Sequence, residues 1–531
     1  MRIPTFVAGL VTLSLTAGPA AAQHEHSQHG KENQVGKVSF ANSCAPEVQE
    51  DLGRAVAMLH SFWYGVGERT FRNVLARDPG CAVATWGIAA LLMNNPLVGV
   101  GSAPDEAKRA QAALDEGRRI GAKTQRERDY IEAVAAYYQD WAARPERERQ
   151  KSLSDAFEAL AGRYPDDDEA QIFSALYIAG TQSQADQSFA AYRKAAAILK
   201  PMFVKYPQHP GVAHYLIHVY DAPPLAQDGL AAARRYAEIA PDAPHALHMP
   251  SHIFTRVGAW RDSDATNRRS FRVAVASGEF GEAYHVSDYA VYADLQLARD
   301  TAALQQMSDA FNVPASGVLN YSYAAAAMPA RYALERGDWA AAAKLEPQSA
   351  GPPSTQSITW FSRAIGGARS GNVAVAEQSA GELDKLHTAL VNAGNAYWAR
   401  ELEVQQLATA AWIAFAHKRM DEALELMRKA ANLEDGNEKH IVTPGRVLPA
   451  RELLGDMLLE AGQPAQALHE YEASQTREPN RFRGYYGAAY AAEAAGDRAK
   501  AAEYYGKLLA LAKGTDSNRP EIARARAFTG G

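Results

Sequence analysis

The feature that most constrains this chain is a repeat of about 34 residues near its C-terminus. It starts at Leu448 and again at Phe482, and each copy spaces large, small and aromatic residues in the same order over two helix-length stretches. The positions that recur are Leu454, Gly455, Leu458, Ala467 and Tyr471 in the first copy and Ala488, Ala489, Ala492, Ala501 and Tyr505 in the second. A unit of this size cannot bury its apolar face alone, so such units stack on one another. The pattern predicts a chain of helical hairpins.

This pattern resembles that of the tetratricopeptide repeat (TPR) superfamily, although the second copy lacks the terminal proline, which is Pro479 in the first. The same frame recurs upstream with varying regularity, starting at Val48, Val134, Leu176, Pro210, Pro244, His285, Tyr323, Ser357 and Val404. The resemblance implies an all-α fold, a TPR-type α-solenoid superhelix of about eleven helix-turn-helix repeats that covers residues 44–515.

Three segments break the repeat period: residues 94–105, 345–356 and 434–446. Insertions in a repeat protein map to loops on one face of the array, and such loops often contact the ligand. The alternative is that they are surface spacers without a role in binding.

The two ends of the chain have a different composition from the repeats. Residues 1–22 combine a basic start, a short apolar stretch and an Ala-rich end, which is typical of a cleaved signal peptide. Residues 23–43 are expected to form a flexible His-rich tail, in which His24, His26 and His29 either capture metal or are solvated without a role, and residues 516–531 a C-terminal tail. No later apolar run approaches the roughly 18 residues of a membrane span. The protein is therefore expected to be periplasmic or secreted, without stable membrane insertion.

The chain has two cysteines, Cys44 and Cys81, which would meet an oxidising compartment after export. They flank the first predicted helical hairpin, whose ends lie close together, so a disulfide is expected between them. The alternative is a pair of buried free thiols. A redox pair is disfavoured because the chain has no C-x-x-C motif.

The formal net charge of −6 is spread along the chain with both signs interspersed. A nucleic-acid-binding protein needs a concentrated basic patch, and none is visible in the sequence. We therefore expect no nucleic acid as a partner.

Seven of the fifteen histidines lie between residues 209 and 285. At about 100° per residue, His214, His218 and Asp221 fall on one narrow stripe of a helix. His245, His248 and His252 fall on a second. Neutral imidazoles that converge from neighbouring helices are ligands for first-row transition metals, with Zn favoured and Cu or Fe as alternatives. The preferred ligands are His214, His218, His248 and His252, and the additional or orienting residues are Asp221, His245 and His285.

The TPR resemblance also implies which helical faces line the concave groove. Carried onto this frame, it places the histidines in the groove rather than in the core, together with His60, Asp288, Glu452 and Asp456. Pro250 complicates this interpretation, because a proline inside a helix removes one backbone hydrogen bond. The helix either starts at Met249–Pro250 or is kinked there.

Two functions follow from these residues. A groove metal with an open position would lower the pKa of a bound water to near 7, and Glu452 or Glu282 could then act as general base. No H-E-x-x-H, G-x-S-x-G, P-loop or dinucleotide motif points to a particular reaction. The alternative is a non-enzymatic scaffold whose groove holds a partner protein or peptide. The runs 213–221 and 245–254 also look like those of bacterial secreted TPR proteins to which no activity is attached.

Overall fold

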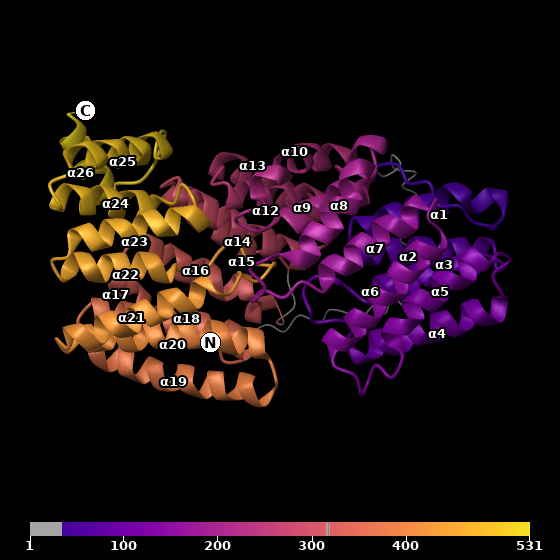
Figure 1. The fold of residues 1–531 in the computed structure, drawn as a ribbon, viewed down its shortest axis with the longest axis horizontal. Coiled ribbons are helices and arrows are strands. Elements are labelled where there is room, and N and C mark those ends of the chain that lie inside the picture. Colours follow the sequence, from indigo (N-terminus) through magenta and orange to yellow (C-terminus); the bar gives the residue numbers. More distant parts are fainter. Residues whose placement is uncertain (1–33, 315–316, 318, 531) are drawn as a thin grey trace, which may run out of the picture. The chain divides into compact units, whose positions relative to one another are not determined.

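The computed structural model describes residues 34–314, 317 and 319–530, and all regular structure in these residues is helical (Figure 1). The elements of the first half are η1 (Pro46–Val48), α1 (Gln49–His60), α2 (Tyr64–Arg77), α3 (Val83–Leu92), α4 (Pro104–Ile120), α5 (Gln125–Tyr138), α6 (Glu146–Arg163), α7 (Asp168–Gly180), α8 (Ala190–Lys205), α9 (Pro210–Tyr220), η2 (Ala226–Gly229), α10 (Leu230–Ile239), α11 (Pro244–His248), α12 (Pro250–Arg256) and α13 (Trp260–Ser277).

The elements of the second half are α14 (Phe280–Gln296), α15 (Asp300–Phe311), η3 (Leu319–Tyr321), α16 (Tyr323–Glu335), α17 (Trp339–Ala342), α18 (Pro353–Arg369), α19 (Val373–Asn392), α20 (Ala396–Ala416), α21 (Met420–Asp435), α22 (Ala450–Glu460), α23 (Pro464–Arg477), α24 (Phe482–Ala494), α25 (Arg498–Leu511) and α26 (Pro520–Thr529). The all-α prediction is confirmed for the described part of the chain.

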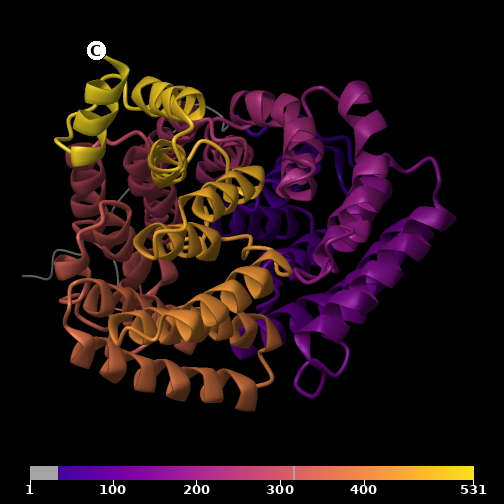
Figure 2. The ribbon, with the colours of Figure 1, turned by 60° about the vertical axis from the view of Figure 1, so that its left-hand side comes forward.

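Consecutive helices pack as pairs, and the pairs stack in chain order, as Figures 1 and 2 show. Twelve pairs run from α1/α2 to α24/α25, with α11 and α12 together forming the first member of one pair and α26 packing on α25. This is the TPR-type α-solenoid that the repeat predicts, with one pair more than expected.

Small residues allow the helices of neighbouring pairs to approach closely. Gly87 of α3 lies under the ring of Phe71 of α2, where an added Cβ would come within 2.2 Å of the ring. In the C-terminal repeats Gly487 lies in the same way against Tyr471. The pattern of small and aromatic residues in the sequence therefore corresponds to these close helix contacts.

The predicted starting residues of the repeats coincide with the first residues of helices in some places and lie inside helices in others. The expected starts at Pro210, Pro244, Tyr323 and Phe482 are the first residues of α9, α11, α16 and α24. The starts at Val134, Leu176 and His285, by contrast, lie inside α5, α7 and α14. These helices are apolar on several faces. The repeat pattern therefore fits them equally well when it is shifted along the helix by a whole turn.

All three predicted interruptions are irregular segments between helices. The segment 94–105 lies largely between α3 and α4, 345–356 between α17 and α18, and 434–446 between α21 and α22. The last of these, extended to residues 436–449, is called the 436–449 segment below.

The structure differs from the predicted boundaries at both ends. The signal peptide and the His-rich tract at residues 23–30 lie outside the described residues. Residues 34–43 are not a free tail, because Val35 and Phe40 are buried and Lys37 N donates to Gln208 O at 2.9 Å. Phe40 also stacks on Trp86. At the C-terminus α26 continues the array where a tail was expected, and it buries Ile522 and Ala525.

Cys44 and Cys81 form the expected disulfide, which joins the segment before α1 to the start of α3. A link across 37 residues restricts the unfolded chain and contributes about 4 kcal/mol in the chain-entropy model. Among the described residues, no helix has the length and apolarity to cross a membrane.

We expect Gly87→Ala to lower the free energy of unfolding by about 1–3 kcal/mol, because the new methyl group has to displace the rigid Phe71 ring. The matched control is Gly381→Ala in the middle of α19, where an added Cβ meets nothing within 4 Å. That variant should gain up to about 1 kcal/mol from its higher helix propensity. Urea unfolding followed by circular dichroism measures both, and equal effects would contradict this account of helix packing.

Candidate metal centre

Four helices bring the predicted histidines together in the interior of the chain. His214 and His218 lie on α9, His245 and His248 on α11, His252 on α12 and His285 on α14. The helix α9 begins at Pro210 with His209 as its N-cap and ends before Asp221, whose ψ of 54° leaves the helical region. The packing of α9 on α12 and of α11 on α14 places the four helices around one centre.

Pro250 interrupts the hydrogen-bonding pattern without turning the chain away. The helix α11 ends at His248 and α12 begins at Pro250, while Met249 between them keeps helical angles of −50° and −37°. From the sequence we expected either a new helix start at Met249–Pro250 or a kink there. The structure has a new helix start at Pro250, and the helical path continues through it. Because the helical path continues, His245, His248 and His252 remain on one side of it.

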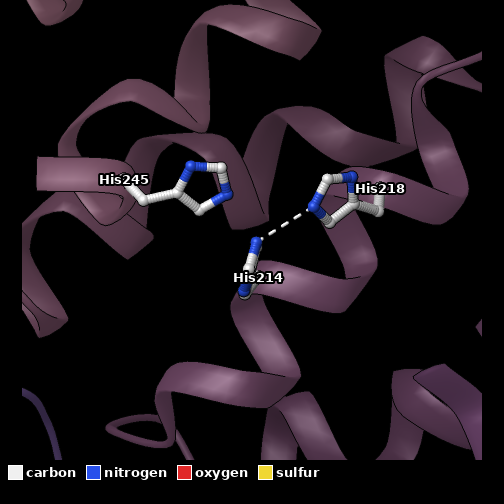
Figure 3. A group of neighbouring side chains, drawn as sticks. All are labelled: His214, His218 and His245. Carbon is white, nitrogen blue, oxygen red and sulfur yellow. Dashed lines mark hydrogen bonds between the residues drawn. The ribbon is translucent and has the colours of Figure 1, made fainter. Parts of the chain in front are cut away.

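The first group of ring nitrogens comes from His214, His218 and His245 (Figure 3). Each histidine offers one nitrogen, and the three nitrogens lie within 4.8 Å of one another. His214 Nε2 and His218 Nε2 are 3.0 Å apart. We call this group the α9 triad.

The second group, which we call the α12 triad, comes from His248, His252 and His285. Its nitrogens also lie within 4.8 Å of one another, and His248 Nε2 is 3.1 Å from His252 Nε2. His285 packs edge-on against His248, with ring centroids 4.4 Å apart. The six histidines expected near the metal thus form two groups of three.

Hydrogen bonds at the opposite ring nitrogens orient most of these imidazoles. His214 Nδ1 donates to His60 O at 2.7 Å, and His248 Nδ1 to Asn267 Oδ1 at 2.6 Å. His252 Nδ1 donates to Asp221 Oδ2 at 2.8 Å, and His245 Nδ1 faces Glu282 Oε1 at 3.2 Å. A histidine whose Nδ1 carries the proton presents an unprotonated Nε2. Metal-ligating histidines are oriented by this kind of contact.

Burial favours the neutral form of five of these imidazoles, those of His214, His218, His248, His252 and His285. It lowers the pKa of His248 and of His285 to about 3 and that of His252 to about 4, and it lowers the pKa of His214 and His218 well below the usual value. Neutral imidazole is the form that binds metal. At neutral pH these five rings therefore have free nitrogen lone pairs rather than positive charges.

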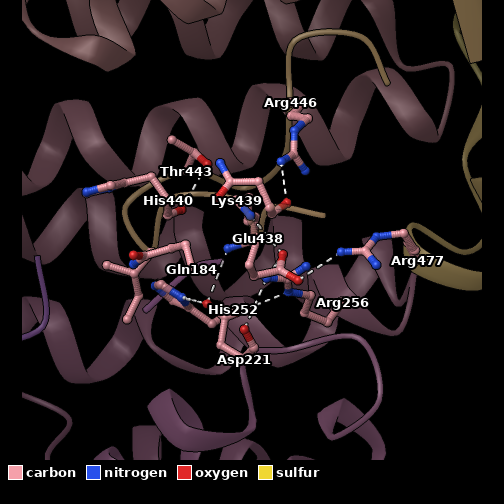
Figure 4. Close-up of polar contacts among 12 residues, drawn as sticks. Gln184, Asp221, His252, Arg256, Glu438, Lys439, His440, Thr443, Arg446 and Arg477 are labelled. Carbon is pink, nitrogen blue, oxygen red and sulfur yellow. Dashed lines mark hydrogen bonds and ion pairs between the residues drawn. The ribbon is translucent and has the colours of Figure 1, made fainter. Parts of the chain in front are cut away.

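Asp221 does not join either triad but anchors His252 from behind. Its Oδ1 accepts from Arg256 Nε at 2.7 Å, and its Oδ2 is 3.3 Å from Lys439 Nζ (Figure 4). Burial disfavours its charged form, yet Lys439 and Arg256 hold the pKa of Asp221 well below its usual value. Of the two roles considered for Asp221, the structure supports that of an orienting residue.

The histidines do not line an open groove, because they are buried among neighbouring side chains, and the 436–449 segment packs against Asp221, Arg256 and Tyr289 beside them. His214, His218, His248 and His252 are at most 3% exposed. Glu438 of this segment pairs with Arg256 at 2.8 Å, and Thr443 O accepts from Tyr289 Oη at 3.0 Å. The cluster is therefore buried where a groove-facing one was expected, and of the two roles considered for the insertion at 434–446, the structure shows it in contact with residues beside the site.

The other predicted lining residues lie in separate ion pairs. Glu452 accepts from Arg481 Nε at 2.7 Å, Asp288 accepts from Arg331 Nε at 2.8 Å, and Asp456 pairs with Arg483 at 2.6 Å. These pairs occupy the carboxylates, which argues against Glu452 as a general base at the histidines. Glu282 remains next to the site through His245.

His60 belongs to a third group, with Glu169 and His209, in which every polar contact is satisfied. His60 Nε2 and His209 Nε2 each lie 2.9 Å from a different oxygen of Glu169. Tyr215 Oη bonds His60 Nδ1 at 2.8 Å, and Val212 N donates to His209 Nδ1. No lone pair of these rings is left for a metal ion, so this group is a hydrogen-bonded core network.

Several residues of the site carry no signal in the sequence. Asn267 on α13 lies 19 residues from His248 along the chain, and Glu438 and Lys439 come from a segment more than 200 residues from Asp221. Only the break in the repeat at 434–446 pointed to that segment. Glu169 and His209 were also missed, because their pairing depends on how α7 packs against α9.

No family model matches this chain, and no curated protein matches it. Similar solved structures include a tetratricopeptide repeat protein from Parabacteroides merdae, with a TM-score of 0.28 and 14% identity over 54% of this chain and 99% of that one. The human IFIT1 dimer with PPP-AAAA has a TM-score of 0.37 and 13% identity over 81% and 90%. The APC/C hetero-tetramer Cut9–Hcn1 has a TM-score of 0.33 and 13% identity over 90% and 89%. Likenesses this distant say nothing about function.

We expect Glu169→Gln to lower the free energy of unfolding by roughly 3 kcal/mol at pH 7 without changing the metal content. Burial opposes ionisation, but His209 and His60 lower the pKa of Glu169 to about 2. The stabilisation is therefore present above the ordinary pKa near 4.5 and is lost as the pH falls towards 2, so the variant and the wild type should converge in acid. Urea unfolding at several pH values measures this, and the exposed Glu425→Gln serves as control. If the difference in free energy of unfolding between the wild type and Glu169→Gln became larger in acid, the assigned role of the Glu169 carboxylate would be contradicted.

Proposed function

We propose that this protein binds transition-metal ions through the histidines of the α9 and α12 triads, in the interior of a TPR-type solenoid. The proposal concerns His214, His218, His245, His248, His252 and His285. Asp221, Asn267 and Glu282 orient the rings through their Nδ1 atoms, together with the backbone oxygen of His60.

The observation that carries the proposal is the contact between His248 Nε2 and His252 Nε2. Both rings have their Nδ1 protons directed at oxygen acceptors, so two lone pairs face each other at 3.1 Å in the buried interior. This arrangement is repulsive unless a cation lies against both nitrogens. Four ligands at 2.0–2.1 Å in a tetrahedron are about 3.3 Å apart, so the observed spacing suits a metal ion.

An all-imidazole donor set favours Zn, with Cu as the second choice and Fe possible in principle. We also propose that the protein is exported to the periplasm, and the disulfide Cys44–Cys81 supports this because it suits an oxidising compartment. The signal peptide at residues 1–22 is part of this proposal and not of the described structure.

A scaffold that binds a partner protein or peptide is the alternative function. The inner face near the histidines offers little room for a peptide, because the 436–449 segment already occupies it. We therefore prefer metal binding. A catalytic role would need an open coordination position, and Glu282 is the carboxylate placed to assist there.

The direct test is metal analysis of protein purified without a His tag. To remove the N-terminal tract, His24, His26 and His29 are replaced by Ala in every variant. After loading with Zn²⁺ and dialysis, this background should retain metal, and replacing His214, His218, His248 and His252 together by Ala should weaken binding by at least about 100-fold. His417→Ala/His469→Ala, which removes two exposed imidazoles, is the matched control and should change nothing. Undiminished binding after removal of the triad histidines, or no binding in the background protein, would refute the proposal.

A second prediction concerns the orientation of His248. Asn267→Ala removes the acceptor of its Nδ1 proton and should weaken Zn²⁺ binding by about 10–100-fold. Asn267→Asp retains an acceptor and should bind far better than the alanine variant. Titration against a chromophoric chelator measures both affinities, and equal values for the two variants would show that this hydrogen bond has no effect on the metal.

A further inference from the structure

We propose that the six histidines form a binuclear centre, in which each triad holds one ion and a small anion, hydroxide in the resting protein, bridges the two. This inference rests on the proposed metal binding and specifies its stoichiometry and the ligand of the open positions.

The division into two sites follows from how the nitrogens are grouped. Each triad gathers three nitrogens within 4.8 Å of one another, and each contains one close pair, at 3.0 Å and 3.1 Å. Three histidines are a complete protein ligand set for a metal ion that keeps one position open. The chain therefore supplies two such sets rather than one set of four with two spare residues.

The two triads also adjoin each other. The ring of His218 lies 5.7 Å from that of His252, and the ring of His245 lies 5.9 Å from that of His248, measured between centroids. Each contact joins one member of the α9 triad to one member of the α12 triad. Ions held by adjoining triads are near neighbours, and their open positions are then close enough to share a ligand.

The charges around the site favour an anion as that ligand. Imidazole ligands carry no negative charge, so they do not offset the charge of two divalent ions. Of the two carboxylates that contact them, Asp221 is already paired with Arg256 and Lys439. Only Glu282 remains to balance the ions. A water molecule bound to both ions readily gives up one proton to solvent, and the hydroxide that forms lowers the remaining positive charge.

Access for such a ligand is limited to one side. The side chains of His245 and Glu282 are 16% and 19% exposed, whereas those of His252 and Asp221 are 3% and 1% exposed. The 436–449 segment covers the Asp221 side through Glu438 and Lys439. Ions and small anions therefore enter past Glu282, and larger molecules are excluded from the centre.

The first test is the stoichiometry of Cu²⁺ or Zn²⁺ in the background without the N-terminal histidines. The wild-type sites should bind two ions per chain. His214→Ala/His218→Ala and His248→Ala/His252→Ala should each retain one ion, while His417→Ala/His469→Ala retains two. If the wild type binds one ion and either triad variant abolishes it, metal binding stands and the binuclear centre is refuted. If the wild type binds none, both proposals fail.

The second test needs no substitution in the triads and so does not depend on whether those variants fold. Cu²⁺ is added to the metal-free protein at pH 7.5 while the electron paramagnetic resonance signal is integrated. One equivalent should give a normal Cu²⁺ signal. A second equivalent should lower the total signal rather than double it, because the spins of two ions that share a hydroxide are coupled. A signal that doubles would show two isolated ions and overturn the bridge.

Discussion

The unprotonated nitrogens of buried imidazoles control the energetics at the centre of this protein. A buried imidazole is stable when both of its nitrogens have partners, and it is strained when two lone pairs meet. His248 and His252 are in the second situation, since their Nδ1 protons are already held by Asn267 and Asp221. Burial disfavours a proton between them, and a metal ion is the partner that fits. The surrounding helices are thus packed around two nitrogens whose proposed partner is a metal ion.

The network of His60, Glu169 and His209 shows that the same kinds of residue need not form a metal site. There a carboxylate lies between two rings, and Tyr215 and the backbone of Val212 satisfy the remaining nitrogens. In the two triads no carboxylate lies between the rings; Asp221 and Glu282 stand behind them instead. The position of the carboxylate therefore distinguishes the two kinds of site. It lies between the imidazoles in the structural network and behind them in the candidate metal centre.

Long-range ion pairs connect this centre to the rest of the solenoid. Asp221 orients His252 and at the same time binds Arg256 and Lys439, and Glu438 links Arg256 to Arg477 of α23. A repeat array normally has contacts only between neighbouring units. Here the 436–449 segment joins the repeats of α9 and α12 to those of α21 and α22, which fixes the surroundings of the site more firmly than local stacking would.

The sequence by itself determined the helical repeat and the identity of the clustered histidines, because these depend on local spacing along the chain, whereas it left a disulfide and two free thiols both open. Residues three, four or seven apart share a helix face wherever the helix lies, so His214, His218, His248 and His252 could be grouped in advance. It could not determine whether that face is open or covered, since this depends on residues far away in the sequence, such as Lys439, which contacts Asp221 across 218 positions. The tertiary structure alone decided that six rings divide into two triads, that Asn267 orients one of them, and that Glu452 is held by Arg481 elsewhere. The reason is physical: helical periodicity fixes the directions of side chains on one helix, whereas the packing of several helices fixes which of those side chains meet.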